Sequence, residues 1–363
     1  MPKKLLLLAT LLALMAVAVL PASGPAAGAP DSATRAQTSE NPLEGVEWYV
    51  DRESPAWLAW QHLSRTGQTA KADLVWKIAR EPRNMWLGGF TRPNFDVKVR
   101  RLIEGAEAEN AVPLFTVLRA ESTSCNLSYD GGGPAEDART RNWYDALARV
   151  IGGSRVVIAF EPDSLGTIDC HAPSRRDDRL KLLRYGVTAL SKLPNATIYV
   201  EAGASDWEPA ARVAKKLRAI GIAKVRGFML NATHYDWTRS NISYGLQVSR
   251  MTGGKNFVIN TAENGRGPVH VRLPNGRRQT VWCNPGFRGM GPPPTTHTSH
   301  PKVDAYLWIN RPGYAQSCGG QKIGWFLPRA LSYARWATDW EGPPKGTRHG
   351  HQQHLTRQQL NIP

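Results

Sequence analysis

Short apolar runs alternate with amphipathic helical patterns along most of this chain, and this alternation constrains the fold more than any other feature. The clearest helical pattern spans Trp207 to Ile220, where apolar residues recur at helical spacing on one face. Strands that alternate with helices build right-handed βαβ units around a parallel sheet. The strand-like runs are Val46 to Val50, Asn84 to Leu87, Val112 to Leu118, Val156 to Phe160, Ala196 to Val200, Val225 to Leu230, Phe257 to Asn260 and Val303 to Ile309.

A parallel sheet of this kind either closes into a barrel or stays open with helices on both faces. Nucleotide-binding open sheets carry a glycine-rich phosphate loop after an early strand, and no Gly-x-Gly-x-x-Gly or Gly-Lys-Ser/Thr loop stands there in this sequence. We therefore predict an α/β fold, a distorted parallel β/α barrel of about seven strands resembling the TIM barrel, in a single domain over residues 41 to 340.

The run from Val156 to Phe160 has the unbroken apolar character of a strand that is buried on both faces. Glu161, Pro162 and Asp163 follow it, at the carboxyl end of the strand, where barrels carry their chemistry. Pro162 has no backbone donor and ends the strand ladder, which presents Asp163 at the strand exit. Asp163 and Ser164 could instead cap a following helix.

Polar and aromatic residues also follow the other predicted strands, at the same end of the barrel. Aromatic rings stack on sugar faces, and amides and carboxylates pair with sugar hydroxyls. These segments show no metal-ligand spacing, so we expect a sugar ligand and neither a metal nor a cofactor. The segments are Glu121 to Gly133, Glu201 to Trp207, Asn231 to Tyr235, Asn260 to Gly265 and Asn310 to Cys318.

Residues 1 to 29 have the features of a secretory signal, because Lys3 and Lys4 precede an apolar core from Leu5 to Leu20 and a stretch of small residues. We therefore predict a secreted, extracellular protein, with a flexible leader over residues 30 to 40 and a basic, disordered tail over residues 341 to 363. The apolar core is too short to favour a stable membrane span.

The formal net charge of +16 indicates attraction to anionic cell-wall or extracellular polymers, although a solvated basic surface is the plainer explanation. Nucleic acid is not an expected partner, because the basic residues are scattered and the signal directs the chain out of the cell. The four cysteines of an exported chain suggest disulfides, with three possible pairings.

Several short motifs, in their order and spacing, resemble those of glycoside hydrolase family 6 over residues 41 to 340. The motifs are Glu161-Pro162-Asp163-Ser164-Leu165, Ala202-Gly203 with Trp207, Leu230-Asn231, Asn264-Gly265, Trp282-Cys283 and Pro312-Gly313. Members of that family are cellobiohydrolases and endoglucanases that cleave β-1,4-glucan with inversion. The resemblance implies a secreted glycosidase that degrades cellulose-type polysaccharide, and we expect a monomer.

The resemblance also assigns roles to individual residues. It makes Asp163 the general acid, and it implies two disulfides, Cys125 with Cys170 and Cys283 with Cys318.

Further residues are expected to contact sugar. Trp207 and Trp282 resemble the sugar platforms of the family, and Tyr49 lies in a segment expected near the same cleft. Asn231 could bind a sugar hydroxyl, or it could only cap a turn. Asn310 and Tyr314 stand where the family has a sugar-binding lysine and glutamate.

The sequence departs from the family at three of its four usual acidic positions. At one of them a family aspartate becomes Glu201, a longer carboxylate that can still ionise. Ser124 stands where the family has the aspartate that tunes the acid, and Gln316 stands where it has the usual base. An inverting enzyme needs a base about 6.5–9.5 Å from its acid, and neither Ser124 nor Gln316 accepts a proton at neutral pH. The first candidate for a replacement base is Asp130, followed by Glu201 and Glu121.

Two alternatives stay open at this stage. The protein could keep the fold and bind polysaccharide without cutting it, having lost the base. It could also hydrolyse another cell-wall glycan, and the positive charge together with Asn310, Arg311 and Tyr314 points to an anionic one. The choice between attack within the glucan chain and attack at its end depends on loops that the sequence does not define.

Overall fold

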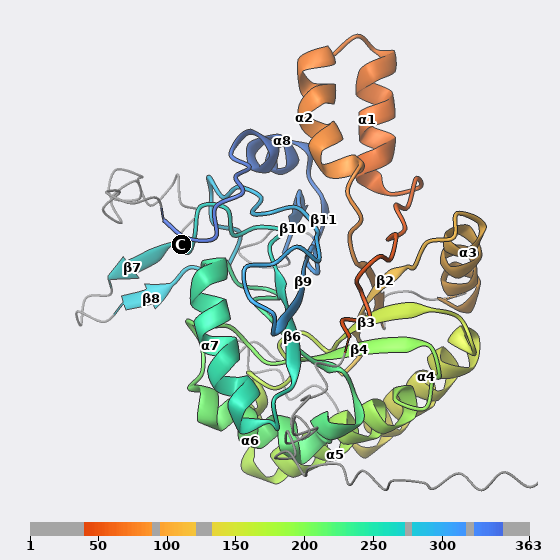
Figure 1. Ribbon diagram of the computed structural model, residues 1–363, viewed down its shortest axis with the longest axis vertical. Coiled ribbons are helices and arrows are strands. Elements are labelled where there is room, and N and C mark those ends of the chain that lie inside the picture. Colours follow the sequence, from red (N-terminus) through yellow and green to blue (C-terminus); the bar gives the residue numbers. More distant parts are fainter. Residues whose placement is uncertain (1–39, 89–94, 121–132, 273–277, 317–322, 344–363) are drawn as a thin grey trace, which may run out of the picture. The chain divides into compact units, whose positions relative to one another are not determined.

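Seven parallel strands form the central sheet, in the spatial order β1-β2-β3-β4-β5-β6-β9 (Figure 1). The computed structural model describes residues 40–88, 95–120, 133–272, 278–316 and 323–343. The strands are β1 (Met85–Gly88), β2 (Leu114–Leu118), β3 (Val156–Phe160), β4 (Ala196–Glu201), β5 (Gly227–Leu230), β6 (Asn256–Asn260) and β9 (Val303–Leu307). Seven of the eight strand-like runs of the sequence therefore became strands of one parallel sheet.

The run from Val46 to Val50 is the exception, because it makes only an isolated parallel bridge between Trp48 and Val112. The chain turns away directly after it. Ser54 N donates to Asp51 O, and the Ser54 side chain then caps the first helix.

Helices follow successive strands and pack against the outer face of the sheet (Figure 1). They are α3 (Phe95–Ala108), α4 (Pro134–Ile151), α5 (Pro173–Leu190), α6 (Ala210–Ile220) and α7 (Thr238–Met251). A separate hairpin of α1 (Pro55–Arg65) and α2 (Thr69–Ala79) packs against α8 (Leu327–Arg335). Within the described ranges, no helix is long and apolar enough to cross a membrane.

The described residues also form short strands and 3-10 helices outside the central sheet. Two small antiparallel hairpins pair β7 (His270–Arg272) with β8 (Arg278–Thr280) and β10 (Tyr314–Ala315) with β11 (Gly324–Trp325). The 3-10 helices are η1 (Ile168–Cys170) and η2 (Ile222–Lys224).

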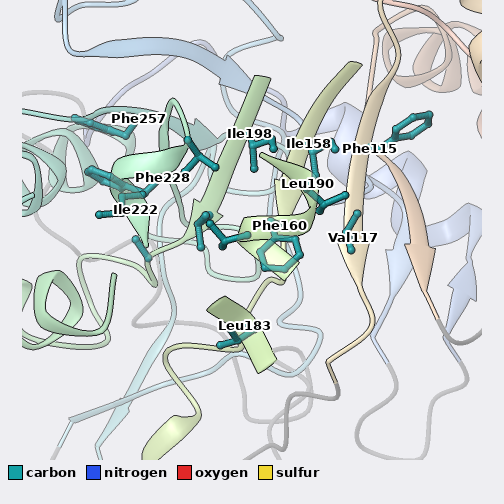
Figure 2. Packing of buried hydrophobic residues seen from close by; sticks show 14 of the residues in the cluster. Phe115, Val117, Ile158, Phe160, Leu183, Leu190, Ile198, Ile222, Phe228 and Phe257 are labelled. Carbon is teal, nitrogen blue, oxygen red and sulfur yellow. The ribbon is translucent and has the colours of Figure 1, made fainter. Parts of the chain in front are cut away.

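Each strand presents alternate side chains to two separate cores. In β3, Val157 and Ala159 face an inner core inside the curl of the sheet, whereas Ile158 and Phe160 face an outer core under the helices. Figure 2 shows part of this outer core, in which strand residues pack with residues such as Leu183 of α5. Burial on both faces explains why β3 appears in the sequence as an unbroken apolar run.

The two edge strands, β1 and β9, meet without a ladder between them in the described part of the chain. Asn84 N donates to Trp308 O at 2.9 Å, and the indole Nε1 of Trp86 donates to Ile309 O at 2.9 Å. Thr116 Oγ1 donates to the same Ile309 oxygen at 3.3 Å. We call this junction the seam. The sheet curls fully around the inner core but is joined there by single bonds, which confirms the predicted distorted barrel.

A buried charge network closes the amino end of the inner core. The carboxylate of Asp304 is 1% exposed and accepts two bonds of 2.8 Å from Arg226, through Nε and Nη2. Tyr199 OH donates to it at 2.7 Å and Asn256 Nδ2 at 2.8 Å. Four donors on one carboxylate tie β4, β5, β6 and β9 together below the inner core.

We expect Asp304→Ala to lower the free energy of unfolding by about 3–5 kcal/mol, because it leaves the partly buried Arg226 without its counter-charge. Tyr199→Phe removes only one of the four donors and should cost about 1 kcal/mol. Urea unfolding of both variants measures the difference. Equal losses would show that Asp304 does not organise this end of the barrel.

Candidate active site

The exit of β3 places Asp163 in an unusual backbone conformation. Glu161 and Asp163 both have positive φ, at 56° and 66°. This region is unfavourable for residues with a side chain and persists only where the surroundings impose it. After Asp163 the chain forms a turn and η1, and no α-helix begins before Pro173. Asp163 is therefore held at the strand exit and does not cap a helix, which removes that alternative.

The carboxylate of Glu161 provides part of the constraint. It is fully buried and accepts bonds from Arg119 N at 2.9 Å and Ala120 N at 3.0 Å, both at the exit of β2. Tyr144 OH of α4 donates to it at 2.6 Å. Burial raises the pKa of Glu161 to about 7. Sequence reasoning missed this role, because a glutamate before a Pro-Asp pair does not reveal its backbone partners.

The carboxyl group of Asp163 lies where the exits of β3 and β5 meet. Thr233 Oγ1, from the segment after β5, donates a hydrogen bond to Asp163 Oδ1. Burial raises the pKa of Asp163, and the Thr233 bond and the nearby His234 only partly oppose this shift. A carboxyl with a raised pKa keeps its proton to higher pH, as a general acid requires.

Glu201, at the end of β4, lies within electrostatic reach of Asp163. Its side chain is 2% exposed, and its oxygens accept backbone bonds from Leu165 N at 2.8 Å and Gly203 N at 2.5 Å. Burial and, next, the charge of Asp163 raise the pKa of Glu201 to about 8. Glu201 therefore keeps its proton near neutral pH, partly because of the neighbouring Asp163 charge. With both oxygens engaged and buried, Glu201 does not fit the predicted role of a water-activating base.

An ion pair that sequence reasoning missed lies beside Asp163. His234 Nδ1 is 2.9 Å from Asp206 Oδ1, and Thr280 Oγ1 donates to the other Asp206 oxygen at 3.2 Å. Burial lowers the pKa of His234, but the Asp206 hydrogen bond and charge more than offset it, so the pKa is raised. The two residues lie 28 positions apart, and only the neighbouring exits of β4 and β5 bring them together.

Trp207 is the predicted sugar platform that the structure places nearest to this group. Its ring stacks on His234, with centroids 4.8 Å apart and planes at 21°. A Cβ atom at Gly166 would lie 2.3 Å from the Trp207 ring, so the ring rests directly on the loop that carries Asp163. Trp207 and Trp282 are both half-buried.

A second group of polar side chains surrounds the carboxylate of Glu263, in the segments after β6 and β9. Asn310 Nδ2 donates to Glu263 Oε2 at 2.6 Å, and Arg329 of α8 lies 3.8 Å from Glu263 Oε1. Burial raises the pKa of Glu263 to about 7. The Asn310 amide oxygen accepts a bond from Arg311 N at 2.9 Å, so Asn310 is a positioning group for both neighbours.

Two of the predicted sugar contacts have structural roles. Tyr49 belongs to the outer core, where its hydroxyl lies against Gly105 of α3, so the expectation that it contacts sugar does not fit its position. Asn231 is fully buried, and its Nδ2 donates to Asp236 O at 3.2 Å and Asn260 O at 3.0 Å. For Asn231 the structure therefore favours the turn-capping alternative.

The remaining predictions are only partly covered by the described residues. Gln316 is held through its backbone, because the Asn284 amide accepts from Gln316 N at 2.7 Å and donates to Gln316 O at 2.9 Å. Neither Cys170 nor Cys283 is a free thiol. The predicted positions outside the described residues are Glu121, Ser124, Cys125, Asp130 and Cys318. Both disulfide pairings and the Asp130 base stay predictions.

We expect Gly166→Ala to displace the Trp207 ring and to destabilise the protein by about 1–3 kcal/mol, because the new methyl group overlaps a rigid side chain. Gly203→Ala is the matched control. Its φ of 71° makes it strained by about 1–2 kcal/mol, but its Cβ would lie 3.6 Å from Trp207, in ordinary contact. A shift in tryptophan fluorescence should appear for Gly166→Ala alone, and a shift of equal size in both variants would contradict this packing.

Comparison with known proteins shows the family of the chain. The profile of glycosyl hydrolases family 6 matches residues 43–323. Endoglucanase A of Cellulomonas fimi is 33% identical over 79% of this chain and 61% of its own length. Endoglucanase A of Thermobispora bispora is 30% identical over 67% of this chain and 52% of its own length. The chain thus spans between about half and three-fifths of these curated relatives.

Solved structures agree with the sequence comparison. Endoglucanase Cel6 from Mycobacterium tuberculosis, in complex with methyl-cellobiosyl-4-deoxy-4-thio-β-D-cellobioside, is 36% identical, with a TM-score of 0.72. The match covers 82% of this chain and 99% of that one. Endoglucanase CEL6B from Humicola insolens, 19% identical with a TM-score of 0.68, shares the fold. The chain belongs to glycosyl hydrolases family 6, the family that the motifs around Asp163 resemble.

Proposed function

We propose that this protein is a secreted enzyme that hydrolyses β-1,4-glucan of the cellulose type with inversion, using Asp163 as the general acid. The observation that carries the proposal is the Asp163 carboxyl itself, which has a raised pKa and is held at the exit of β3 by a bond from Thr233. The relatives named endoglucanases, and the cellobioside-type ligand of the Mycobacterium tuberculosis structure, support this choice of substrate.

In the proposed reaction, Asp163 donates its proton to the glycosidic oxygen while a water molecule attacks the anomeric carbon from the opposite face. The leaving sugar departs as an alcohol, and the water proton passes to a base. Burial and, next, the charge of Asp163 raise the pKa of Glu201 to about 8, so Glu201 itself holds a proton near neutral pH. The base is then a different group, and Asp130 is our candidate because Glu201 is buried with both oxygens bound.

Aromatic rings at the carboxyl end of the sheet are the proposed sugar contacts. Trp207 and Trp282 are half-buried, so each keeps part of its surface for stacking on a sugar ring. Tyr314, also half-buried, lies edge to face with Trp325 of β11 at a centroid distance of 6.0 Å. Asn310 acts in this proposal by orienting Glu263 and the Arg311 backbone.

A second candidate function is binding of the polysaccharide without cleavage. Gln316 favours it, since an amide with its backbone clamped by Asn284 stands where the family resemblance expects the base. The two functions differ in whether products form at all.

Asp163→Asn should lower kcat/KM on cello-oligosaccharides by at least about 100-fold, because the amide cannot protonate the leaving oxygen. The substitution is nearly isosteric and retains an acceptor for Thr233, so the thermal midpoint should change little. Product chromatography measures the loss, and NMR of the first products should show the α anomer if cleavage inverts.

Cleavage that survives Asp163→Asn would refute Asp163 as the acid. Retention of the oligosaccharide by the unaltered protein without any products would instead support the binder. Asp130→Asn in the same assay tests the base, since unchanged turnover would exclude it.

We expect His234→Asn to shift the alkaline limb of the pH profile of kcat/KM to higher pH. The general acid must be protonated, so activity falls as the pH rises through its pKa. The substitution removes a neighbouring positive charge that lowers the pKa of Asp163, so the acid keeps its proton to higher pH. Glu201→Gln is the comparison variant, because Glu201 is not among the groups that shift the pKa of Asp163, and the limb should stay nearly in place. A shift to lower pH in His234→Asn, or an equal shift in both variants, would contradict the electrostatic account.

A further inference from the structure

Three cationic side chains gather beside the seam without a carboxylate partner among the described residues. Arg83 lies in the connection from α2 to β1, Lys98 lies in the first turn of α3, and Arg311 follows β9. Burial lowers the pKa of both Lys98 and Arg311, and neighbouring charges add to this. Arg311 and Arg83 lower the pKa of Lys98, against Asp51, which raises it. Arg83 lowers the pKa of Arg311, against Glu263, which raises it. Like charges therefore accumulate at this place in the fold.

Other poorly exposed arginines of the chain have acceptors. Arg288, only 1% exposed, donates to three backbone carbonyls, and three further arginines carry a carboxylate. Arg226 binds Asp304 at 2.8 Å, Arg119 binds Glu136 at 2.7 Å, and Arg329 lies 3.8 Å from Glu263. No such ion pair is formed by Arg311 in the part of the chain that the structure describes. An uncompensated charge that is largely withdrawn from water is unfavourable, which makes its retention a sign of a missing partner.

The guanidinium of Arg311 is held rigidly between two rings. It lies 4.9 Å from the centroid of the Trp86 ring and 4.1 Å from that of Tyr314. Trp86 is fixed by its bond to Ile309 O, and Tyr314 is packed against Trp325. The buried Nε of Arg311 has no hydrogen-bond partner among the described residues. A fixed, planar guanidinium whose Nε lacks an acceptor is suited to bind a carboxylate.

The two acidic groups near this cluster are already engaged elsewhere. Asp51 accepts a bond from Arg101 at 3.2 Å. Glu263 is bonded to Asn310 and lies beside Arg329. Glu263 acts on Arg311 through its charge but forms no ion pair with it among the described residues, so the Arg311 Nε stays without an acceptor.

We propose that Arg311, together with Arg83 and Lys98, binds an anionic substituent of the glycan, either a carboxylate or a sulfate ester. This inference rests on the proposed function, because it names the class of glycan that the same end of the barrel accepts. The net charge of +16 would raise the local concentration of such a polymer. The preferred substrate is then a β-1,4-linked glycan that carries negative groups in place of some neutral ones.

Calorimetric titration of the Asp163→Asn protein tests this, because the ligands then stay intact. The three ligands are a neutral cello-oligosaccharide, the same oligosaccharide oxidised to carboxylates at C6, and the same oligosaccharide bearing sulfate esters. We expect at least one anionic ligand to bind about 10-fold more tightly than the neutral one, with an advantage that shrinks as salt is added. Which anion binds better identifies the group.

Arg311→Gln in the same background should bring the affinity ratio of anionic to neutral ligand close to one. Arg311→Lys keeps the positive charge but not the planar guanidinium, and it should retain only part of the preference for the anionic ligand. Arg149→Gln, at an exposed position on α4, removes one charge elsewhere and should leave the ratio unchanged. Should Arg311→Gln fail to fold, Arg83→Gln makes the same test without removing the stacked side chain.

The outcomes separate this inference from the function on which it rests. Equal binding of neutral and anionic ligands, or a preference that survives Arg311→Gln, would overturn the anion site and leave glucan hydrolysis standing. Failure of all three ligands to bind, with no products from the unaltered protein, would overturn both.

Discussion

The buried carboxylate of Glu161 is the interaction on which the candidate site depends. It accepts backbone hydrogens from Arg119 and Ala120 and the Tyr144 hydroxyl, so one side chain joins the exits of β2 and β3 to α4. These bonds help to maintain the positive φ of Glu161 and Asp163 against its intrinsic cost. A relaxed strand exit would point Asp163 elsewhere, and its contact with Thr233 would be lost. The acid is thus positioned by a neighbour that does no chemistry itself.

The two edge strands of the sheet that carries Asp163 are joined by only a few hydrogen bonds. The seven strands form six neighbouring pairs, each over three to five residues, whereas β1 and β9 meet through single donors from Asn84 and Trp86. Backbone groups that a closed barrel would use for a ladder are satisfied here by an indole and a threonine hydroxyl. Trp86 serves both purposes, because the side chain that bridges the seam also supports the Arg311 guanidinium.

The sequence was sufficient for the parts that depend on local pattern. The strand from Val156 to Phe160 was predicted with the same first and last residues, because a strand that is buried on both faces has an unbroken run of apolar residues. Asp163 at its exit followed from Pro162. The pairing of Asp206 with His234 was missed, because no local pattern links the two residues. Tyr49 was expected near the cleft but lies in the outer core, because the sequence around a tyrosine does not show which face of the sheet its side chain occupies. Contacts between strand exits are set by register, which a single sequence does not state.

The groups that set the pKa of Asp163 are different from the cations at the seam. The pKa of Asp163 is set by its burial, by the Thr233 bond and by His234, all from the exits of β3 and β5. The cations lie instead around β1 and β9, on the opposite edges of the curled sheet, where Arg311 and Arg83 act on each other. Further cations placed beside the acid would lower its pKa in addition to His234 and would favour loss of its proton. Selection of an anionic chain at the seam is therefore compatible with a protonated Asp163, because Arg83, Lys98 and Arg311 are not among the groups that shift its pKa.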